Sequence, residues 1–235
     1  MKKILQIFLL IIASVYLFIY FGNDFLILVE SNEPSQSFGN VANGQLNNGK
    51  RLPSSRNNFV TYSRLGSLIG RNGVHNKVRN VILESFETLY KDYPEYKYVI
   101  GETSWLSGGS MKPHRTHQNG TSVDFMVPIR NHENEIEILP TNVFNKLGYN
   151  AEFDSTGRNE NYFIDFESIA IHLYYLNVAA VKHNVKIDFV IFDPTLQKIL
   201  FKTEYGSKIK EQLRFNTKSV WVRHDEHYHV NFKLE

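Results

Sequence analysis

The chain of 235 residues contains no cysteine. This absence excludes disulfide bonds, thiol nucleophiles and zinc sites built from cysteine thiolates. No segment concentrates lysine or arginine, and the formal net charge is only +2. Because a nucleic-acid-binding surface needs a basic patch, we expect no nucleic-acid partner. No internal repeat is apparent.

The longest apolar run lies at the N-terminus. It extends from Ile4 to Phe21, is interrupted only by Gln6 and Ser14, and follows two lysines. As a helix this run would be roughly 27 Å long, close to the thickness of a bilayer's hydrocarbon core. We therefore expect residues 1–29 to form an uncleaved anchor in the inner membrane, with the positively charged N-terminus in the cytoplasm. A cleaved signal peptide is the alternative.

Two further segments follow this leader. Residues 30–48 are rich in serine, asparagine, glycine and glutamine, and this composition predicts a polar linker without a core of its own. Residues 49–235 are numerous enough for one domain with a sizeable core.

The folded part mixes helices and strands. Apolar residues at helical spacing predict a helix over residues 76–90, and an almost entirely apolar stretch predicts a buried helix over 166–181. The pair Asp193-Pro194 predicts the start of a short helix. The remaining expected elements are an inserted loop over 144–161 and strands over 96–100, 122–128, 187–192, 220–222 and 227–232. Because helices and strands do not alternate regularly, the predicted fold class is α+β.

Five of the nine histidines fall in two short clusters that lie far apart in the sequence. The first cluster contains His114, His117 and the nearby Asp124, and the second contains His224, His227 and His229. Imidazole is a common metal ligand near neutral pH, and a carboxylate adds an anionic oxygen. The clusters therefore predict one metal site assembled from distant parts of the chain.

Strand geometry sorts the members of these clusters. His227 and His229 are two residues apart, so both imidazoles point to the same face of a strand, while Tyr228 points toward the core. The same alternation puts Asp124 on the face opposite to Phe125. The chain has no His-Glu-x-x-His pattern, which excludes the helical arrangement found in many zinc proteases.

Two histidines and one carboxylate, with water in the fourth position, form a recurrent catalytic zinc set, whereas a structural site would be closed by four protein ligands. Water bound to zinc loses a proton near neutral pH and becomes a hydroxide nucleophile. The remaining histidines are then available for acid–base work. We therefore expect one zinc ion, although such donors also accept manganese, iron or cobalt.

Both clusters resemble those of the penicillin-insensitive murein endopeptidases, a family grouped with lysostaphin-type peptidases, D-Ala-D-Ala metallopeptidases and the hedgehog fold. The resemblance covers most of the chain after the linker. Its motifs are Asn43-Gly44-x-Leu46-x-x-Gly49-x-x-Leu52-Pro53, Gly108-Gly109, His114-x-x-His117-Gln118-x-Gly120-x-x-Val123-Asp124 and His224-Asp225-x-His227-x-His229-Val230. The resemblance implies a hedgehog-type or D-Ala-D-Ala-peptidase-like fold, in which helices flank a small antiparallel sheet that carries the zinc site.

The resemblance also implies a role for each site residue. The implied zinc ligands are His117, Asp124 and His229, the implied catalytic residues are His227 and His224, and His114 borders the pocket. His227 is the expected base, and His224 is expected to stabilise the oxyanion or to help protonate the departing amine. The implied activity is that of a periplasmic metalloprotease that hydrolyses the D-alanyl–meso-diaminopimelyl cross-link between peptidoglycan stem peptides.

The chain departs from the family pattern in several places. Ser122 stands where the family has an acidic residue, disulfides are absent, and residues 147–161 look unlike those of its members. Three other readings stay open: a D-Ala-D-Ala-type carboxypeptidase, a non-catalytic peptidoglycan-binding module stabilised by a metal, and a purely structural metal site. Asp225 and Glu226 are candidates for a base, although we expect them to be solvated turn charges.

Overall fold

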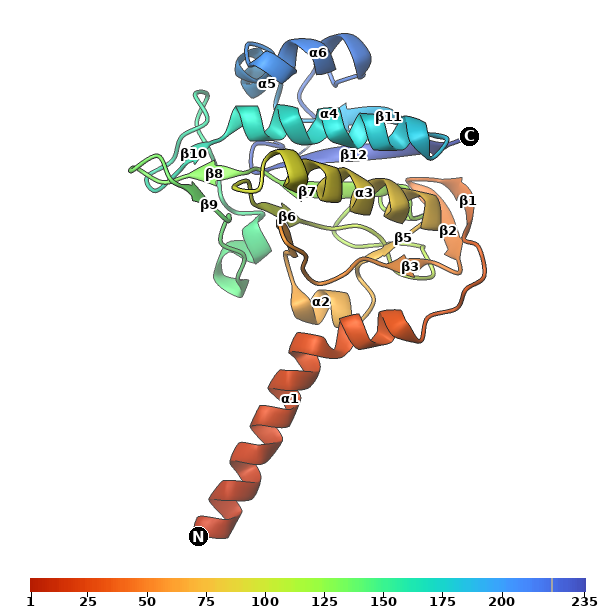
Figure 1. The fold of residues 1–235 in the computed structure, drawn as a ribbon, viewed down its shortest axis with the longest axis vertical. Coiled ribbons are helices and arrows are strands. Elements are labelled where there is room, and N and C mark those ends of the chain that lie inside the picture. The colour runs from red at the N-terminus through yellow and green to blue at the C-terminus, as the bar shows by residue number, and fades with distance from the viewer. Residues whose placement is uncertain (221) are drawn as a thin grey trace.

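The computed structural model describes residues 1–220 and 222–235. It has the predicted α+β architecture, with a sheet of five strands at its centre (Figure 1). The strand order is β11 (Val185–Ile191), β12 (His227–Leu234), β7 (Ser122–Met126), β6 (Tyr98–Ile100) and β4 (Phe59–Thr61). β4 and β6 run parallel, and the other neighbouring strands of this sheet are antiparallel.

Two long helices lie along the central sheet (Figure 1). α3 (Asn76–Asp92) confirms the helix predicted from apolar spacing, and its buried stripe includes Val78, Ile82 and Phe86. α4 (Phe166–Lys182) confirms the second predicted helix and packs against α3 and β11. The helices and the sheet together enclose the hydrophobic core.

Two shorter helices lie on the outer side of α4 (Figure 1). α5 (Pro194–Leu200) begins as predicted after Asp193, whose Oδ1 accepts hydrogen bonds from the N–H groups of Thr195 at 2.7 Å and Leu196 at 3.2 Å. α6 (Glu204–Gln212) also packs against α4. Because α4 has neighbours on several sides, its sequence is apolar nearly all round.

The two faces of the central sheet differ in character. Phe125 of β7 and Tyr228 of β12 point toward the helices, where their ring centroids lie 5.5 Å apart and the Tyr228 hydroxyl hydrogen-bonds Nδ1 of His172 in α4 at 2.7 Å. Asp124 and His229 alternate with them along the strands and stand directly opposite each other in register. The predicted alternation is therefore confirmed, and the face turned away from α4 carries the titratable side chains.

Residues 30–48 do not form the polar linker that their composition predicted. They contain an antiparallel hairpin of β1 (Gln36–Asn40) and β2 (Asn43–Asn47), in which Leu46 is 1% exposed. The N–H of Leu46 donates to the carbonyl of Ser107 at 3.0 Å and so joins the hairpin to the loop after β6. The polar composition of this segment did not reveal its structure, because the segment is held to the domain by backbone hydrogen bonds and by the single buried side chain of Leu46.

Shorter strands and an irregular segment border the central sheet. β3 (Lys50–Arg51) pairs with β5 (Gly73–Val74), and β8 (Ile129–Arg130) pairs with β9 (Ile136–Glu137) and β10 (Phe163–Ile164). The loop expected over 144–161 is largely irregular but begins within a 3-10 helix, η1 (Val143–Gly148). The strand predicted over 220–222 includes residue 221, which lies outside the described residues.

Among the described residues, one helix is long and apolar enough to cross a membrane, namely α1 (Lys2–Leu28). None of its most apolar window is buried, and signal sequences and membrane anchors share this length and composition. Its C-terminal end contacts α2 (Arg64–Leu68), and the rest of α1 projects from the domain (Figure 1). The N-terminal segment thus has the form expected from the sequence.

The buried His172 leads to a prediction about stability. Burial lowers its pKa from 6.5 to about 3, so the folded protein keeps the ring neutral while the unfolded chain protonates it. The stability that depends on the neutral ring is complete above pH 6.5 and falls by about 1.4 kcal/mol per unit as the pH drops toward the folded pKa.

The variant His172→Gln keeps an acceptor for the Tyr228 hydroxyl but removes this titration. Between pH 7 and pH 5 it should therefore lose about 2 kcal/mol less unfolding free energy than the unmodified protein. Urea unfolding of both full-length proteins in detergent measures the difference. Equal losses in the two proteins would contradict the prediction.

Candidate metal centre

The pairing of β7 with β12 brings two titratable side chains together. Asp124 and His229 are opposite each other in register, and Nδ1 of His229 lies 2.7 Å from Oδ1 of Asp124. Nε2 of the same ring lies 2.8 Å from Oδ1 of Asn231. Asp124 and His229 are only 1% and 2% exposed, so this contact is shielded from water.

His117 reaches the same carboxylate from a loop. Its Nε2 lies 3.3 Å from Oδ1 of Asp124, and its ring centroid is 4.7 Å from that of His229. The backbone of His117 has a φ of +67°, in the left-handed region that is unfavourable for a residue with a Cβ. Such a conformation persists only where the surroundings hold it, and it is often found at functional sites.

The β1–β2 hairpin and a glycine supply that support. The N–H of Gln118 donates to the carbonyl of Val41 in the hairpin turn at 3.1 Å, and the N–H of Gly109 donates to the carbonyl of Gln118 at 2.8 Å. Gly108 has a φ of +67°, and a Cβ there would lie 2.4 Å from the Gln118 carbonyl oxygen. Only glycine permits this approach, so the hairpin and the Gly108-Gly109 loop together position His117.

His114 completes a group of three possible metal ligands. His114, His117 and Asp124 each offer one ligand atom, and these atoms lie within 4.8 Å of one another. Imidazole nitrogens and a carboxylate oxygen are donors that zinc and related divalent cations accept. Nε2 is the nitrogen of His117 that faces Asp124, whereas Nδ1 is buried without a hydrogen-bond partner among the described residues. The residues present therefore fit a metal ion.

The structure places the predicted zinc ligands next to this group. His117 and Asp124 belong both to the predicted set and to the group of three. Nδ1 of His229 lies 2.7 Å from Oδ1 of Asp124, although His229 is not a member of the group of three, and the His114 ring centroid is 5.3 Å from that of His117. His114 also has Nε2 3.7 Å from Oε2 of Glu102. All four residues thus converge on one buried region.

Asp124 stays ionised at this buried position. Burial alone would raise its pKa, but the charges of His117 and His227 and the hydrogen bond from His229 outweigh burial and hold the pKa of Asp124 well below its usual range. For the same reason the pKa of His117 is raised although burial acts to lower it. A bound cation would compete with protons for these nitrogens.

His227 lies beside the group and is oriented by an acidic neighbour. Its Nδ1 lies 2.9 Å from Oε1 of Glu226, and its Nε2 lies 3.8 Å from Oδ2 of Asp124. Because a carboxylate can only accept a hydrogen bond, Nδ1 is the donor. Burial lowers the pKa of His227, but Asp124 and Glu226 outweigh burial and raise it above the ordinary value.

His224 is only partly buried and stands next to His227, with the two ring centroids 4.5 Å apart. Its Nδ1 lies 2.8 Å from the carbonyl oxygen of Val222, so Nδ1 donates and Nε2 of the neutral ring is left as an acceptor. Burial and the neighbouring His227 lower the pKa of His224 to about 4. His224 is therefore neutral at neutral pH.

Two residues at the site were not identified from the sequence. The Tyr149 hydroxyl donates to Oδ2 of Asp124 at 2.8 Å and accepts from the N–H of Glu102 at 2.9 Å. Glu102 is 2% exposed and forms an ion pair with Arg71. Tyr149 belongs to residues 147–161, the segment that looks unlike the murein endopeptidases whose motifs the chain resembles. This unusual segment was the only feature of the sequence that pointed to Tyr149. Nothing in the local spacing marks Glu102.

The expectation that Asp225 and Glu226 are solvated turn charges is wrong, because both side chains are buried. Oδ2 of Asp225 accepts a hydrogen bond from the N–H of Phe153 at 2.6 Å and lies 3.3 Å from Nη1 of Arg223. Burial raises the pKa of Asp225 to about 6. Partners from a distant loop make this burial possible, and local sequence does not reveal them.

Comparison with known proteins assigns no family to this chain. No protein-family model matches the sequence, and no curated protein is significantly similar to it. The function has to be argued from the geometry and chemistry of the site together with the motif residues.

Asp124 belongs to both possible ligand sets, so its substitution tests the metal centre directly. Asp124→Asn keeps the size of the side chain but removes the charge, and it should weaken zinc binding by at least about 100-fold. Metal analysis after chelation and reloading with zinc measures the effect. The exposed His132, replaced by alanine, serves as the control and should leave the zinc content unchanged. Undiminished zinc content in the Asp124→Asn protein would show that the zinc is held by other residues and not by Asp124.

Proposed function

We propose that this protein is a zinc-dependent murein endopeptidase with a hedgehog-type fold that hydrolyses the D-alanyl–meso-diaminopimelyl cross-links of peptidoglycan. The observation that carries the proposal is the approach of His117 Nε2 and His229 Nδ1 to Oδ1 of Asp124, at 3.3 Å and 2.7 Å. Two imidazoles and one carboxylate leave the fourth position of a tetrahedral zinc site open, as hydrolytic zinc sites require. The motif resemblance supplies the substrate class.

In this proposal His117, Asp124 and His229 hold one zinc ion. His229 has the second contact that a metal-ligating histidine usually needs, because its Nε2 is fixed by Asn231 while its Nδ1 faces Asp124. His114 contacts both His117 and Glu102 and lies at the edge of the proposed site. A bound zinc ion supplies Lewis-acid polarisation of the scissile carbonyl and lowers the pKa of coordinated water to near neutral.

His227 is the proposed general base. Glu226 keeps the proton on Nδ1, so Nε2, which faces Asp124, is the atom that accepts a proton from the attacking water. The imidazole is 4% exposed, and its orientation is therefore set by Glu226 instead of by solvent. Carboxylate-oriented imidazoles are a common arrangement for general bases.

Two roles were expected for His224, and its hydrogen bond favours one of them. With the Nδ1 proton directed at the Val222 carbonyl, the neutral ring has no proton on Nε2 to donate to an oxyanion. Nε2 can instead receive the proton that His227 has taken from the attacking water and pass it to the departing amine, since the two ring centroids are 4.5 Å apart. Proton delivery is thus the role we propose for His224.

The location of the site supports the choice of substrate. If α1 spans the inner membrane with its lysines in the cytoplasm, the metal centre lies in the periplasm, where peptidoglycan is the nearest amide-bearing polymer. A purely structural metal site would be closed by a fourth protein ligand, and His114 would have to supply it beside His117, Asp124 and His229. The buried pair of His227 and Glu226 argues against a module that only binds, because binding alone needs no oriented base.

The base assignment predicts a separation of metal binding from catalysis. His227→Ala should retain zinc but cleave defined cross-linked muropeptide dimers about 10²- to 10⁴-fold more slowly, because it removes the proton acceptor. Mass spectrometry of timed digests, with and without a chelator, measures the rate and the products. The His132→Ala protein should cleave at the unmodified rate.

The products also distinguish the other readings. Monomers released from dimers support an endopeptidase, whereas free D-alanine would point to a carboxypeptidase on the same scaffold. Tight muropeptide binding without hydrolysis by zinc-loaded protein would favour a binding module. Loss of zinc from the His227→Ala protein would make His227 a ligand and overturn its assignment as the base.

A further inference from the structure

The last part of α1 is built into the folded domain. The Asn23 side chain is fully buried, and its Nδ2 donates to the carbonyl of Leu52 at 3.0 Å and to Oγ of Ser54 at 3.1 Å. Its Oδ1 accepts hydrogen bonds from Nδ2 of Asn72 at 2.9 Å and from Nη1 of Arg51 at 3.2 Å. These bonds fix the end of α1 to the domain, so α1 is not a flexible tether.

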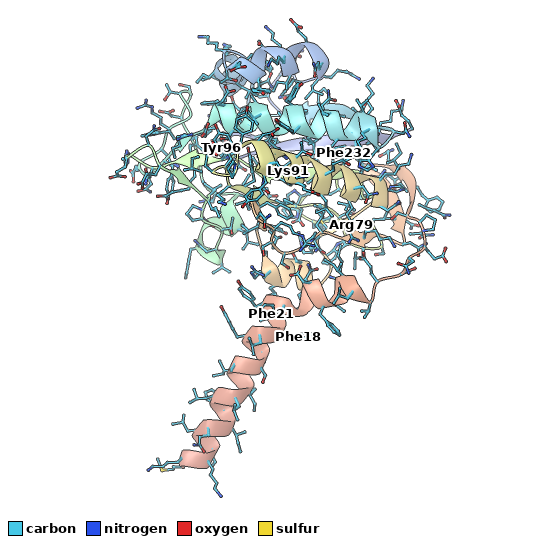
Figure 2. All side chains as sticks on the ribbon, viewed as in Figure 1. Phe18, Phe21, Arg79, Lys91, Tyr96 and Phe232 are labelled. Carbon is cyan, nitrogen blue, oxygen red and sulfur yellow. The ribbon has the colours of Figure 1, made fainter. Side chains whose placement is uncertain are left out.

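Neighbouring residues extend this junction. Oδ1 of Asp24 accepts from the N–H of Ser54 at 3.2 Å. The Glu30 carboxylate forms an ion pair with Arg79 of α3 and accepts from the N–H of Arg51 at 3.1 Å. Figure 2 labels Arg79 on α3, above the end of α1. The folded domain therefore sets the direction in which α1 leaves it.

The length of α1 places the membrane boundary at this junction. The apolar run from Ile4 to Phe21 is roughly 27 Å long as a helix, and the hydrocarbon core of a bilayer is about 30 Å thick. When the run fills the core, the boundary falls close to Gly22, where Leu68 of α2 packs against α1. Figure 2 shows Phe18 and Phe21 at the point where α1 reaches α2.

The side chains at this height are typical of a lipid interface. The Arg64 guanidinium lies over the Tyr20 ring, 3.8 Å from its centroid, and Nη1 of Arg64 donates to the Tyr20 carbonyl at 3.0 Å. Tyr16 stacks on Tyr20 with a centroid distance of 6.0 Å. Tyrosine rings and basic side chains gather at the headgroup level of membrane proteins. The boundary therefore passes beside α2.

The end of α1 and the neighbouring α2 carry five large apolar side chains that are more than half exposed. Leu65 and Ile69 belong to α2 and its C-terminal cap, and because they are four residues apart they share one face. Phe25, Leu28 and Val29 follow at the end of α1 with the spacing of one helix face. These five residues, called here the membrane-facing surface, continue the exposed apolar surface of α1.

We propose that the membrane-facing surface rests in the lipid headgroup region of the bilayer that α1 spans, and that it holds the domain in one orientation on the membrane. Exposed apolar patches mark interaction sites, and continuity with a bilayer-spanning helix identifies lipid as the partner. The metal centre is then kept at a fixed height above the bilayer. This inference is independent of the reaction that the site catalyses.

The absence of cysteine makes the test direct, because single cysteines can be introduced into the full chain and spin-labelled. Ile69→Cys reports on the membrane-facing surface, and Ile11→Cys, near the middle of the apolar run of α1 and 56% exposed, reports on the bilayer core. Val181→Cys is the matched control, since Val181 is 69% exposed on α4, across the domain from α1 (Figure 1). Each labelled protein is reconstituted into vesicles of phosphatidylethanolamine and phosphatidylglycerol.

Power-saturation spectroscopy then compares collisions of each label with oxygen, which partitions into lipid, and with a water-soluble nickel chelate. The oxygen-to-nickel ratio at Ile69 should be several-fold higher than at Val181 and lower than at Ile11. A ratio at Ile69 equal to that at Val181 would overturn the proposal. Protection of Ile69 from both reagents would also overturn it, because a protein would then cover the surface. A label at Phe25→Cys repeats the test from α1.

Discussion

The ionised side chain of Asp124 is the constraint on which the site depends. An unpaired carboxylate at 1% exposure would be strongly unfavourable, so the fold must surround it with donors or a cation. Nitrogens of His117 and His229 face one oxygen, and the Tyr149 hydroxyl donates to the other. Because its negative charge is buried, the carboxylate is unfavourable when unpaired and attracts a divalent cation strongly.

The partners of Asp124 reach it by different routes. His229 is held opposite Asp124 by the pairing of β12 with β7, and side chains on paired strands are positioned more rigidly than side chains on loops. His117 sits on a loop whose left-handed backbone is held by the β1–β2 hairpin, and Tyr149 arrives from an irregular segment. On the far side of the sheet the buried His172 and the aromatic core keep β7 and β12 in place. The site therefore combines one rigid contact with two that depend on long-range support.

The periodicity of apolar residues predicted the secondary structure that depends on residues close together in the sequence. The helices α3 and α4, the cap at Asp193 and the alternation along β7 and β12 follow from spacing within a few residues, and each was predicted. The hairpin at 36–47, the contact of Tyr149 with Asp124 and the burial of Asp225 depend on residues far away in the chain. The pattern of one sequence does not reveal contacts between distant residues. For this reason the predictions of a polar linker over residues 30–48 and of solvated charges at Asp225 and Glu226 were wrong.

The central claim is that one divalent ion binds where His117 and His229 meet Asp124. The most direct measurement is anomalous X-ray scattering from crystals of the zinc-loaded protein, with data collected on both sides of the zinc absorption edge. We expect a single anomalous peak in contact with Nε2 of His117, Oδ1 of Asp124 and Nδ1 of His229. A peak held by His114 in place of His229, or no peak at Asp124, would contradict it.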